Sequence, residues 1–375
     1  MTKSLFFVLL LGFLVLPSSG QGQEKDKKLA EHIGQMLIVG FRGLEVDENS
    51  PIVKDIRQGR VGGVILFDYD VALNSSTRNI QSPQQLKKLT SDLQDATSTP
   101  LLIAVDQEGG RVARLKEKHG FPPTVSQAWL GKHNNPELTH RYASQTASTL
   151  AQMGVNLNLA PVVDVNVNPE NPVIGRLERS FSSDPEVVAR QAAEVITAHR
   201  GHNILTALKH FPGHGSSTHD SHHGFTDITN TWTEAELIPY ARLFESPGAD
   251  VVMTAHVFNS RLDPEWPATM STKILDNLLR QEMGFTGVII SDDMQMGAIR
   301  DNYSLEIALE RTLLAGADII IFGNNLVHEP DIAKRAIQII RNLVRESRIS
   351  ASNIRQSYAR IMRLKNRLVM AARNK

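Results

Sequence analysis

The sequence of 375 residues contains no cysteine. This absence excludes a disulfide framework, a cysteine nucleophile and metal sites built from thiolates. It also excludes a lipid attached to an N-terminal cysteine. Any stability outside the reducing cytoplasm must therefore come from side-chain packing.

The sequence also lacks an excess of charge of either sign, because 40 Lys and Arg residues balance 40 Asp and Glu residues. This balance argues against a protein that binds nucleic acid through its overall charge. Hydrophobic residues make up 41% of the chain and charged residues 21%, which is typical of a globular protein. We therefore expect a folded chain that has no nucleic acid as partner.

Long apolar runs are absent except near the N-terminus, where one extends from Leu5 to Leu16. It follows Lys3, is shorter than the roughly 20 residues that span a bilayer, and is followed by small residues. This layout predicts a secretory signal peptide over residues 1–20, with an uncleaved anchor as the alternative. We expect an exported protein, periplasmic or extracellular, without stable membrane insertion after cleavage.

Short apolar segments rich in β-branched residues recur along residues 21–375 and predict eight strands. The predicted strands are Gln35–Val39, Val61–Phe67, Leu101–Val105, Val155–Ala160, Ile204–Leu208, Val251–Thr254, Val288–Ile290 and Asp318–Phe322. Their near-continuous hydrophobicity is typical of strands buried on both faces of a parallel sheet.

Amphipathic helices alternate with these strands. Ser82 is a candidate N-cap before a helix that begins at Pro83, and Ser271 is a candidate N-cap before a second helix. Further helices are predicted at Asp184–Ala198, Leu305–Leu314, Glu234–Phe244 with a kink at Pro239, and twice within Asp331–Ala372. This alternation predicts an α/β fold, a single (β/α)8 barrel with C-terminal helices over residues 21–375, and a doubly wound open sheet is the alternative.

Polar residues follow most of the predicted strands directly. They lie in Asp106–Arg111, Pro161–Asp164, Lys209–Gly215, Ala255–His256, Ser291–Asp293 and Gly323–Asn325. In a barrel, the C-terminal ends of all strands meet at one rim. Carboxylates, a Lys-His pair and Arg residues at one rim are suited to a hydroxylated substrate, because each buried hydroxyl needs a partner.

The histidines of Lys209–His223 allow two kinds of chemistry. His210 and His214 could bind a metal, with His219, His222 or Asp220 completing the site of a metal-dependent hydrolase. However, Pro212 and Gly213 separate the first pair, which therefore cannot share one face of a helix. Alternatively, one histidine could act as a general acid and base, as His222 could with Asp220 two positions before it.

Four strings of residues stand out in this order along the chain. They are Asp106-Gln107-Glu108-Gly109-Gly110-Arg111-Val112, Arg179-Ser180-Phe181, Lys209-His210-Phe211-Pro212-Gly213-His214-Gly215 with Asp220-Ser221-His222, and Ser291-Asp292-Asp293-Met294. Together they resemble the motifs of β-N-acetylhexosaminidases of glycoside hydrolase family three. The histidine-rich string is long and specific, and the resemblance covers nearly all of residues 21–375.

The resemblance implies a barrel that removes terminal non-reducing β-linked N-acetylglucosamine with retention, without metal or organic cofactor. It implies that Asp292 is the nucleophile and that His222 with Asp220 is the acid/base pair. It also implies a set of sugar-binding residues, namely Asp106, Arg114, Arg179, Lys209 and His210. The most similar branch of the family acts on peptidoglycan fragments, so muropeptides are the expected substrate and chito-oligosaccharides the alternative.

Two points of the assignment rest on the motifs alone. Chemistry does not distinguish Asp292 from Asp293 as nucleophile. The segment Arg176-Leu177-Glu178 is about two residues longer than is usual in the family, and we favour Arg179 over Arg176 as the sugar ligand because it keeps its place before Ser180-Phe181. A sugar-binding protein without catalysis is a further alternative, but it would gain nothing from keeping the nucleophile and the acid/base pair together.

Overall fold

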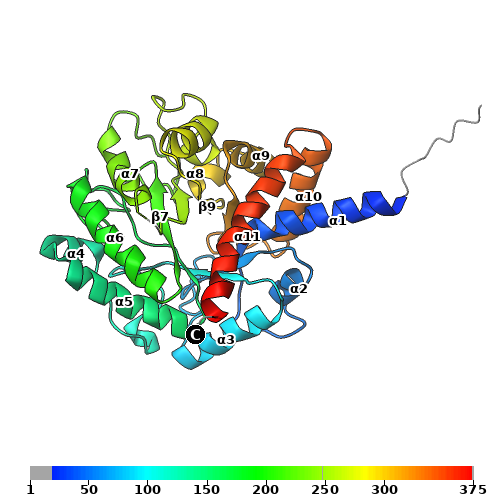
Figure 1. Cartoon of the computed structure of the whole chain (residues 1–375), viewed down its shortest axis with the longest axis horizontal. Helices are drawn as coiled ribbons and strands as arrows, with labels where there is room; N and C mark the ends of the chain where they lie inside the picture. Colours follow the sequence, from blue (N-terminus) through cyan, green and yellow to red (C-terminus); the bar gives the residue numbers. More distant parts are fainter. Residues whose placement is uncertain (1–18, 247, 374–375) are drawn as a thin grey trace, which may run out of the picture.

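Eight parallel strands close into a barrel with helices around it (Figure 1). The computed structural model describes residues 19–246 and 248–373, so the predicted signal peptide, apart from Ser19 and Gly20, lies outside the described residues. The predicted (β/α)8 barrel is confirmed, and the open sheet is excluded because the first and last strands, β1 and β10, pair with each other.

The barrel strands follow the predicted segments closely. In the order in which they pair, they are β1 (Leu37–Gly40), β10 (Ile319–Phe322), β9 (Val288–Asp293), β8 (Val251–Thr254), β7 (Leu205–Phe211), β6 (Leu157–Asn158), β3 (Leu102–Val105) and β2 (Gly63–Leu66). Three strands continue past their predicted ends, β1 to Gly40, β7 to Phe211 and β9 to Asp293. The barrel itself therefore carries Lys209, His210 and Asp292.

Helices and one small hairpin connect the strands. The helices are α1 (Ser19–Gln35), α2 (Pro51–Arg57), α3 (Pro83–Asp95), α4 (Gln127–His133), α5 (Pro136–Gln152), α6 (Pro185–Gly201), α7 (Ile238–Phe244), α8 (Gly297–Arg300), α9 (Leu305–Ala315), α10 (Ile332–Arg345) and α11 (Ala351–Arg373), with the short or irregular η1 (Glu117–His119), η2 (Glu234–Leu237), η3 (Ala268–Met270) and η4 (Lys273–Glu282). The hairpin pairs β4 (Gln107–Gly109) with β5 (Val112–Ala113). Within the described residues, none of the helices is both long and apolar enough to cross a membrane.

The predicted helix starts are confirmed at the atomic level. Ser82 Oγ accepts a hydrogen bond from Gln85 N at 3.2 Å, and Ser271 Oγ accepts one from Ile274 N at 3.1 Å. The segment Glu234–Phe244 differs from its prediction. It is divided into η2 and α7, and Pro239 lies in the first turn of α7 rather than at a kink inside one helix. A proline is tolerated there because the first turn has no helical acceptor for its missing N–H.

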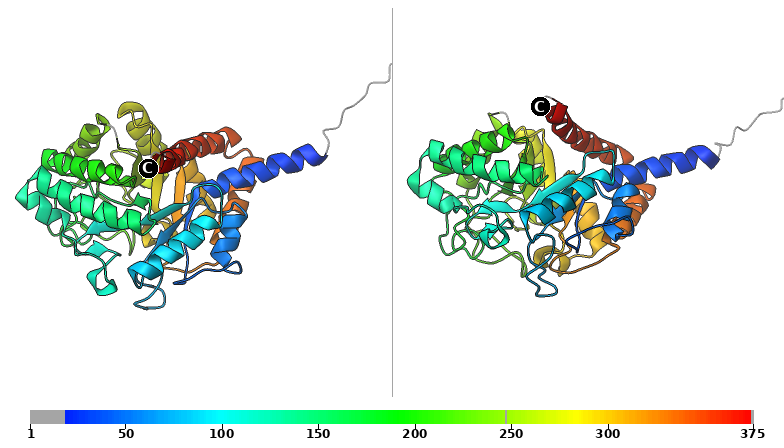
Figure 2. Two further views of the ribbon diagram at one scale, coloured as in Figure 1. Left: turned by 60° about the horizontal axis from the view of Figure 1, so that its bottom comes forward. Right: turned by 90° about the horizontal axis from the view of Figure 1, so that it is seen from below.

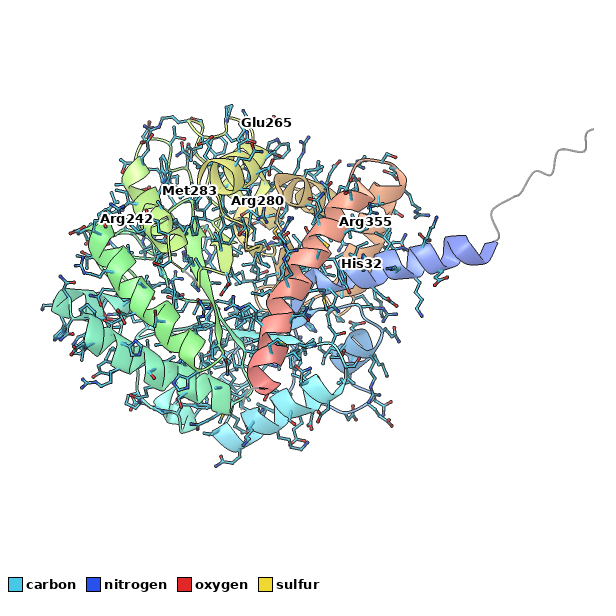
Figure 3. All side chains as sticks on the ribbon, viewed as in Figure 1. His32, Arg242, Glu265, Arg280, Met283 and Arg355 are labelled. Carbon is cyan, nitrogen blue, oxygen red and sulfur yellow. The ribbon has the colours of Figure 1, made fainter. Side chains whose placement is uncertain are left out.

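The C-terminal helix α11 covers the N-terminal end of the barrel. Arg360 Nε donates to Asp318 Oδ1 at 2.8 Å just before β10, and Lys365 Nζ donates to the carbonyl of Gly62 at 2.7 Å just before β2. In Figure 1, α11 crosses the end of the barrel. Figure 2 shows α1 extending away from the barrel. Figure 3 shows Arg355 of α11 beside His32 of α1, where the two helices cross. The open end of the barrel is therefore the opposite one.

Candidate active site

A cavity of about 420 Å³ lies at the C-terminal ends of the strands. Its walls include every residue that the sequence assigned to catalysis or sugar binding: Asp106, Arg114, Arg179, Lys209, His210, Asp220, His222 and Asp292. These residues come from four strand ends and the loops after them. The structure thus brings all eight together in one place.

Asp106 lies in the cavity wall, where its carboxylate is hydrogen-bonded to two cationic side chains. Asp106 Oδ1 accepts a hydrogen bond from Lys209 Nζ at 2.8 Å, and its Oδ2 accepts one from Arg114 at 3.3 Å. Burial acts to raise the pKa of Asp106, but Lys209 and Arg114 outweigh it and hold the pKa well below its ordinary value. This side chain is therefore an ionised acceptor, while Arg114 and Lys209 supply donors for hydroxyl groups.

Glu108 is a functional candidate that the sequence analysis did not single out. Its side chain is almost fully buried and binds Arg179 through two hydrogen bonds of 2.7 and 2.8 Å, while Lys209 Nζ lies 2.7 Å from its Oε1. Its only signal was its position in the string after the third strand. The bidentate pair fixes the guanidinium plane of Arg179 in the cavity.

The longer segment before Ser180 separates the two candidate arginines. Arg179 lines the cavity, whereas Arg176 pairs with Glu170 and both of those side chains are exposed. The segment also places Leu177 in the cavity wall. Arg179 is therefore the arginine that can reach a ligand in the cavity.

Asp164 is fully buried behind the cavity and orients His210. Its Oδ2 lies 2.7 Å from His210 Nδ1, and its Oδ1 accepts the backbone N–H of the same residue at 3.1 Å. On the other side of the ring, Arg179 lies 3.2 Å from Nε2. Because a guanidinium can only donate, Nε2 is the acceptor and Nδ1 carries the proton that Asp164 receives. Asp164 belongs to a predicted polar segment, but the sequence gave no sign of this partner.

His222 and Asp220 form a hydrogen-bonded pair at the mouth of the cavity. His222 Nδ1 lies 2.7 Å from Asp220 Oδ1, and the His222 side chain is 45% exposed, so Nε2 can meet a substrate. Burial acts to lower the pKa of His222, but the hydrogen bond to Asp220 and the charge of Asp292 raise it above 6.5. The pKa of Asp220 falls to about 2 despite its partial burial, because His222 donates to it. Asp220 therefore favours the protonated form of the ring, the form that can donate a proton.

The two neighbouring carboxyl groups at the end of β9 differ in their environments. Burial acts to raise the pKa of Asp292, but His256, His210 and His222 face it and lower the pKa below its ordinary value. Burial raises the pKa of Asp293 to about 6, and its Oδ1 is occupied by the backbone N–H groups of Gln295 and Gly323. Asp292 is thus the more acidic of the two carboxyl groups, while Asp293 is held by the backbone, a difference that could not be read from the sequence.

His210 in β7 and His214 in the loop after it do not direct their ring nitrogens to a common site. His210 and His214 use their ring nitrogens on Asp164, Arg179 and two serines, and their ring centroids are 5.8 Å apart. Across residues 19–246 and 248–373, no group of three or more His, Asp or Glu side chains has an arrangement that could hold a metal ion. The donor geometry therefore favours the acid/base interpretation of this loop.

Glu236 lies beneath this loop, fully buried. Its Oε2 accepts the backbone N–H of Gly215 at 2.9 Å. Gly213 has a φ of +123°, and a Cβ at that position would meet the Glu236 side chain at 2.6 Å. Burial raises the pKa of Glu236 to about 8, so this carboxyl group is mostly protonated at neutral pH.

We expect Glu236→Gln to change how stability depends on pH. A folded-state pKa of about 8 against 4.5 in the unfolded chain means that the wild type loses stability as pH rises from about 4.5 to about 8. The variant has no such group. The difference in unfolding free energy should therefore grow in its favour by up to roughly 1.4 kcal/mol per pH unit in that window.

Urea denaturation at pH 5, 6.5 and 8 measures this difference. Glu234→Gln, two residues away at an exposed position, is the matched control and should give a difference that does not vary with pH. Parallel behaviour of the two variants would show that Glu236 ionises freely in the folded protein.

The comparison with protein families agrees with the site geometry. The family described as glycosyl hydrolase family 3 N terminal domain matches residues 28–364. The chain belongs to this family. The family predicted from the four strings of residues is therefore confirmed.

Individual relatives of the chain are named as β-hexosaminidases or β-N-acetylglucosaminidases. The chain is 34% identical over 334 residues to "Beta-hexosaminidase A" of Pseudoalteromonas piscicida, covering 82% of this chain and 54% of that protein. It is 35% identical over 312 residues to "Beta-hexosaminidase" of Xylella fastidiosa strain 9a5c, covering 81% and 87%. Among solved structures, a family 3 β-N-acetylglucosaminidase from Paenibacillus sp. FPU-7 superposes with a TM-score of 0.83 at 35% identity, covering 91% of this chain and 62% of that one. The chain thus spans little more than half of some family 3 relatives and most of others.

Proposed function

We propose that this chain is a retaining exo-β-N-acetylglucosaminidase. The observation that carries the proposal is the presence, in one cavity, of a carboxyl group of lowered pKa at Asp292 and a hydrogen-bonded His222–Asp220 pair in which the pKa of the imidazole is raised. The names of the relatives, β-hexosaminidase and β-N-acetylglucosaminidase, support the choice of sugar. Most retaining glycosidases use two carboxyl groups, and here the histidine takes the place of one of them.

In the first step, Asp292 attacks the anomeric carbon while His222, protonated, gives its Nε2 proton to the glycosidic oxygen. The glycosidic bond breaks, the leaving sugar departs as an alcohol, and a glycosyl-aspartate ester forms. In the second step, neutral His222 takes a proton from water as the water attacks the same carbon. The ester bond breaks, Asp292 is released as a carboxylate, and His222 is protonated again.

Five polar residues of the cavity, together called the sugar-binding wall, would bind the sugar. We assign the hydroxyl groups and the N-acetyl group to Asp106, Arg114, Arg179, Lys209 and His210. The buried ion pairs among these residues and Glu108 hold the donors in place before the substrate arrives. Such preorganisation lowers the cost of orienting the substrate.

We further propose that the natural substrates are muropeptides outside the cytoplasm. The resemblance to the peptidoglycan-active branch of the family and the predicted signal peptide over residues 1–20 support this assignment. Chito-oligosaccharides are the alternative, since they present the same terminal sugar. No nucleic acid, metal or organic cofactor takes part in the proposed reaction.

The proposed function is tested by incubating the purified protein with 4-nitrophenyl N-acetyl-β-glucosaminide, with the corresponding β-glucoside, and with both after EDTA treatment. We expect hydrolysis of the N-acetyl sugar alone, unchanged by EDTA. Release of N-acetylglucosamine from a muropeptide, compared with its release from di-N-acetylchitobiose, then tests the natural substrate. Loss of activity with EDTA, or none on either sugar, would contradict the proposal.

The pH dependence should report the hydrogen bond between Asp220 and His222. Because Asp220 raises the pKa of His222, the protonated form needed in the first step persists above pH 6.5. We expect Asp220→Asn to move the basic limb of kcat/KM for di-N-acetylchitobiose to lower pH, since the amide does not stabilise the imidazolium. An unmoved basic limb would contradict a role for Asp220 in setting this pKa.

A further inference from the structure

His214 is a buried histidine for which the proposed mechanism has no use. Its side chain does not line the cavity, yet both ring nitrogens have partners: Nδ1 lies 2.7 Å from Ser217 Oγ and Nε2 lies 3.1 Å from Ser221 Oγ. Ser221 is the residue between Asp220 and His222. The ring therefore contacts the acid/base loop directly behind its catalytic pair.

Both ring nitrogens of His214 contact serine hydroxyls. Ser217 Oγ lies 2.7 Å from Nδ1 and 3.0 Å from the carbonyl of His214, and its one proton can go to either acceptor. A neutral ring donates from one nitrogen and accepts at the other, so the contacts with Ser217 and Ser221 can both be hydrogen bonds in either tautomer. Burial lowers the pKa of His214 to about 4, which agrees with a neutral ring at neutral pH.

His214 is itself fixed from the side of the sugar-binding wall. Its backbone N–H donates to Asp164 Oδ1 at 2.8 Å, and Asp164 is the same fully buried carboxylate that orients His210. Its carbonyl accepts from Asn171 Nδ2 at 2.7 Å. The position of His214 is therefore defined relative to the sugar-binding residues and not only to its own loop.

The backbone of the acid/base loop is held from the other side by α8. The carbonyls of Ser221 and His222 accept the N–H groups of Ala298 and Gly297 at 3.2 and 3.1 Å. These contacts hold the main chain, while the Ser221 side chain, 2% exposed, is directed to His214. Asp220 and His222, one residue to either side of it, both line the cavity.

We propose that His214 is a positioning residue, which holds Ser221 and thereby places the His222–Asp220 pair against the leaving-group oxygen of a substrate bound beside His210. The inference rests on the proposed function, because it takes His222 as the acid. Misplacing a catalytic group by about 1 Å can cost as much as 100-fold in rate. Loss of this contact should therefore impair proton donation selectively and leave sugar binding intact.

The first test is Ser221→Ala, which removes the hydroxyl that is hydrogen-bonded to His214 and leaves the rest of the loop. We expect kcat/KM for di-N-acetylchitobiose, whose leaving group needs a proton, to fall about tenfold. The value for 2,4-dinitrophenyl N-acetyl-β-glucosaminide should change by less than about twofold, because that leaving group needs little protonation. Inhibition by N-acetylglucosamine should be unchanged.

Two further variants make the test specific. Thr218→Ala removes a hydroxyl from the same loop, one that contacts His219 at the exposed surface, and should leave both substrates unaffected. His214→Phe keeps a ring of similar size without the two nitrogens and should reproduce the selective loss. Adding Ser221→Ala to it should cause no further selective loss, because both changes break the same contact.

The outcomes distinguish a failure of the positioning role of His214 from a failure of the proposed function. Equal losses on both substrates, or no loss, in Ser221→Ala would overturn the positioning role. His222→Ala is measured alongside. If its loss depends on the leaving group and that of Ser221→Ala does not, only the role of His214 falls. If the loss in His222→Ala does not depend on the leaving group, the acid assignment falls and the positioning role falls with it.

Discussion

Replacing Asp292 by alanine is expected to reduce turnover of 4-nitrophenyl N-acetyl-β-glucosaminide by about four orders of magnitude. The reason is that the variant lacks the more acidic of the two carboxyl groups that β9 places in the cavity, the one proposed as nucleophile, so no glycosyl-aspartate can form. The fold and the binding of N-acetylglucosamine should remain, because the sugar-binding wall is built from other strands. Steady-state kinetics, with thermal unfolding and product inhibition as checks, measure the effect.

Asp293→Asn is the matched control for this prediction. The asparagine oxygen can accept the same backbone N–H groups of Gln295 and Gly323 that Asp293 Oδ1 accepts, so most activity should be retained. Added azide should restore turnover in Asp292→Ala, since it can enter the space of the lost side chain, and it should give the α-glycosyl azide. If Asp293→Asn were the inactive variant and Asp292→Ala the active one, the nucleophile would have to be reassigned.

Replacing His222 by alanine is expected to lower kcat/KM for di-N-acetylchitobiose by about 10³-fold, within the range usual for a general acid. The loss on 2,4-dinitrophenyl N-acetyl-β-glucosaminide should be below about tenfold, because this ratio reports the first step and that leaving group departs without a proton. The second step still needs the base. A rapid burst of dinitrophenolate followed by slow turnover should therefore appear in stopped-flow measurements.

The burst separates the two roles of His222. A burst without leaving-group dependence would assign the residue to the second step alone. Dependence on the leaving group without a burst would assign it to the first step alone. Equal losses on both substrates with no burst would argue against both roles.

The fold could be predicted because its determinants are local. Segments such as Val251–Thr254 are apolar throughout, as strands covered on both faces must be, and capping residues such as Ser82 mark helix starts within a few positions. The place of the chemistry followed from the same pattern, since parallel strands direct their ends to one rim. Pro239 misled the prediction because the helical pattern of the sequence continues across η2 and α7. The backbone, however, changes there from a 3-10 helix to an α-helix that begins at Ile238.

The partners of the site residues could not be predicted because they are distant in sequence. Glu108 pairs with Arg179 71 positions away, and Asp164 reaches His210 46 positions away. No periodicity reports such a pairing, which depends on how loops from different strands approach each other. The choice between Asp292 and Asp293 is of the same kind, since it depends on which histidines and backbone groups surround each carboxyl group.

The placement of α1 and α11 at the covered end of the barrel has a practical consequence for attaching the protein to a surface. A tether joined to α11 leaves from the covered end, opposite the cavity, and one joined to α1 leaves along a helix that projects away from the barrel (Figure 2). A protein attached in this way to beads or to a membrane anchor would thus present the open end of its barrel to the solution. Large glycan fragments could then reach the cavity without passing the support. An affinity tag for purification can be placed at the C-terminus for the same reason, because a tag before residue 1 would be removed with the predicted signal peptide.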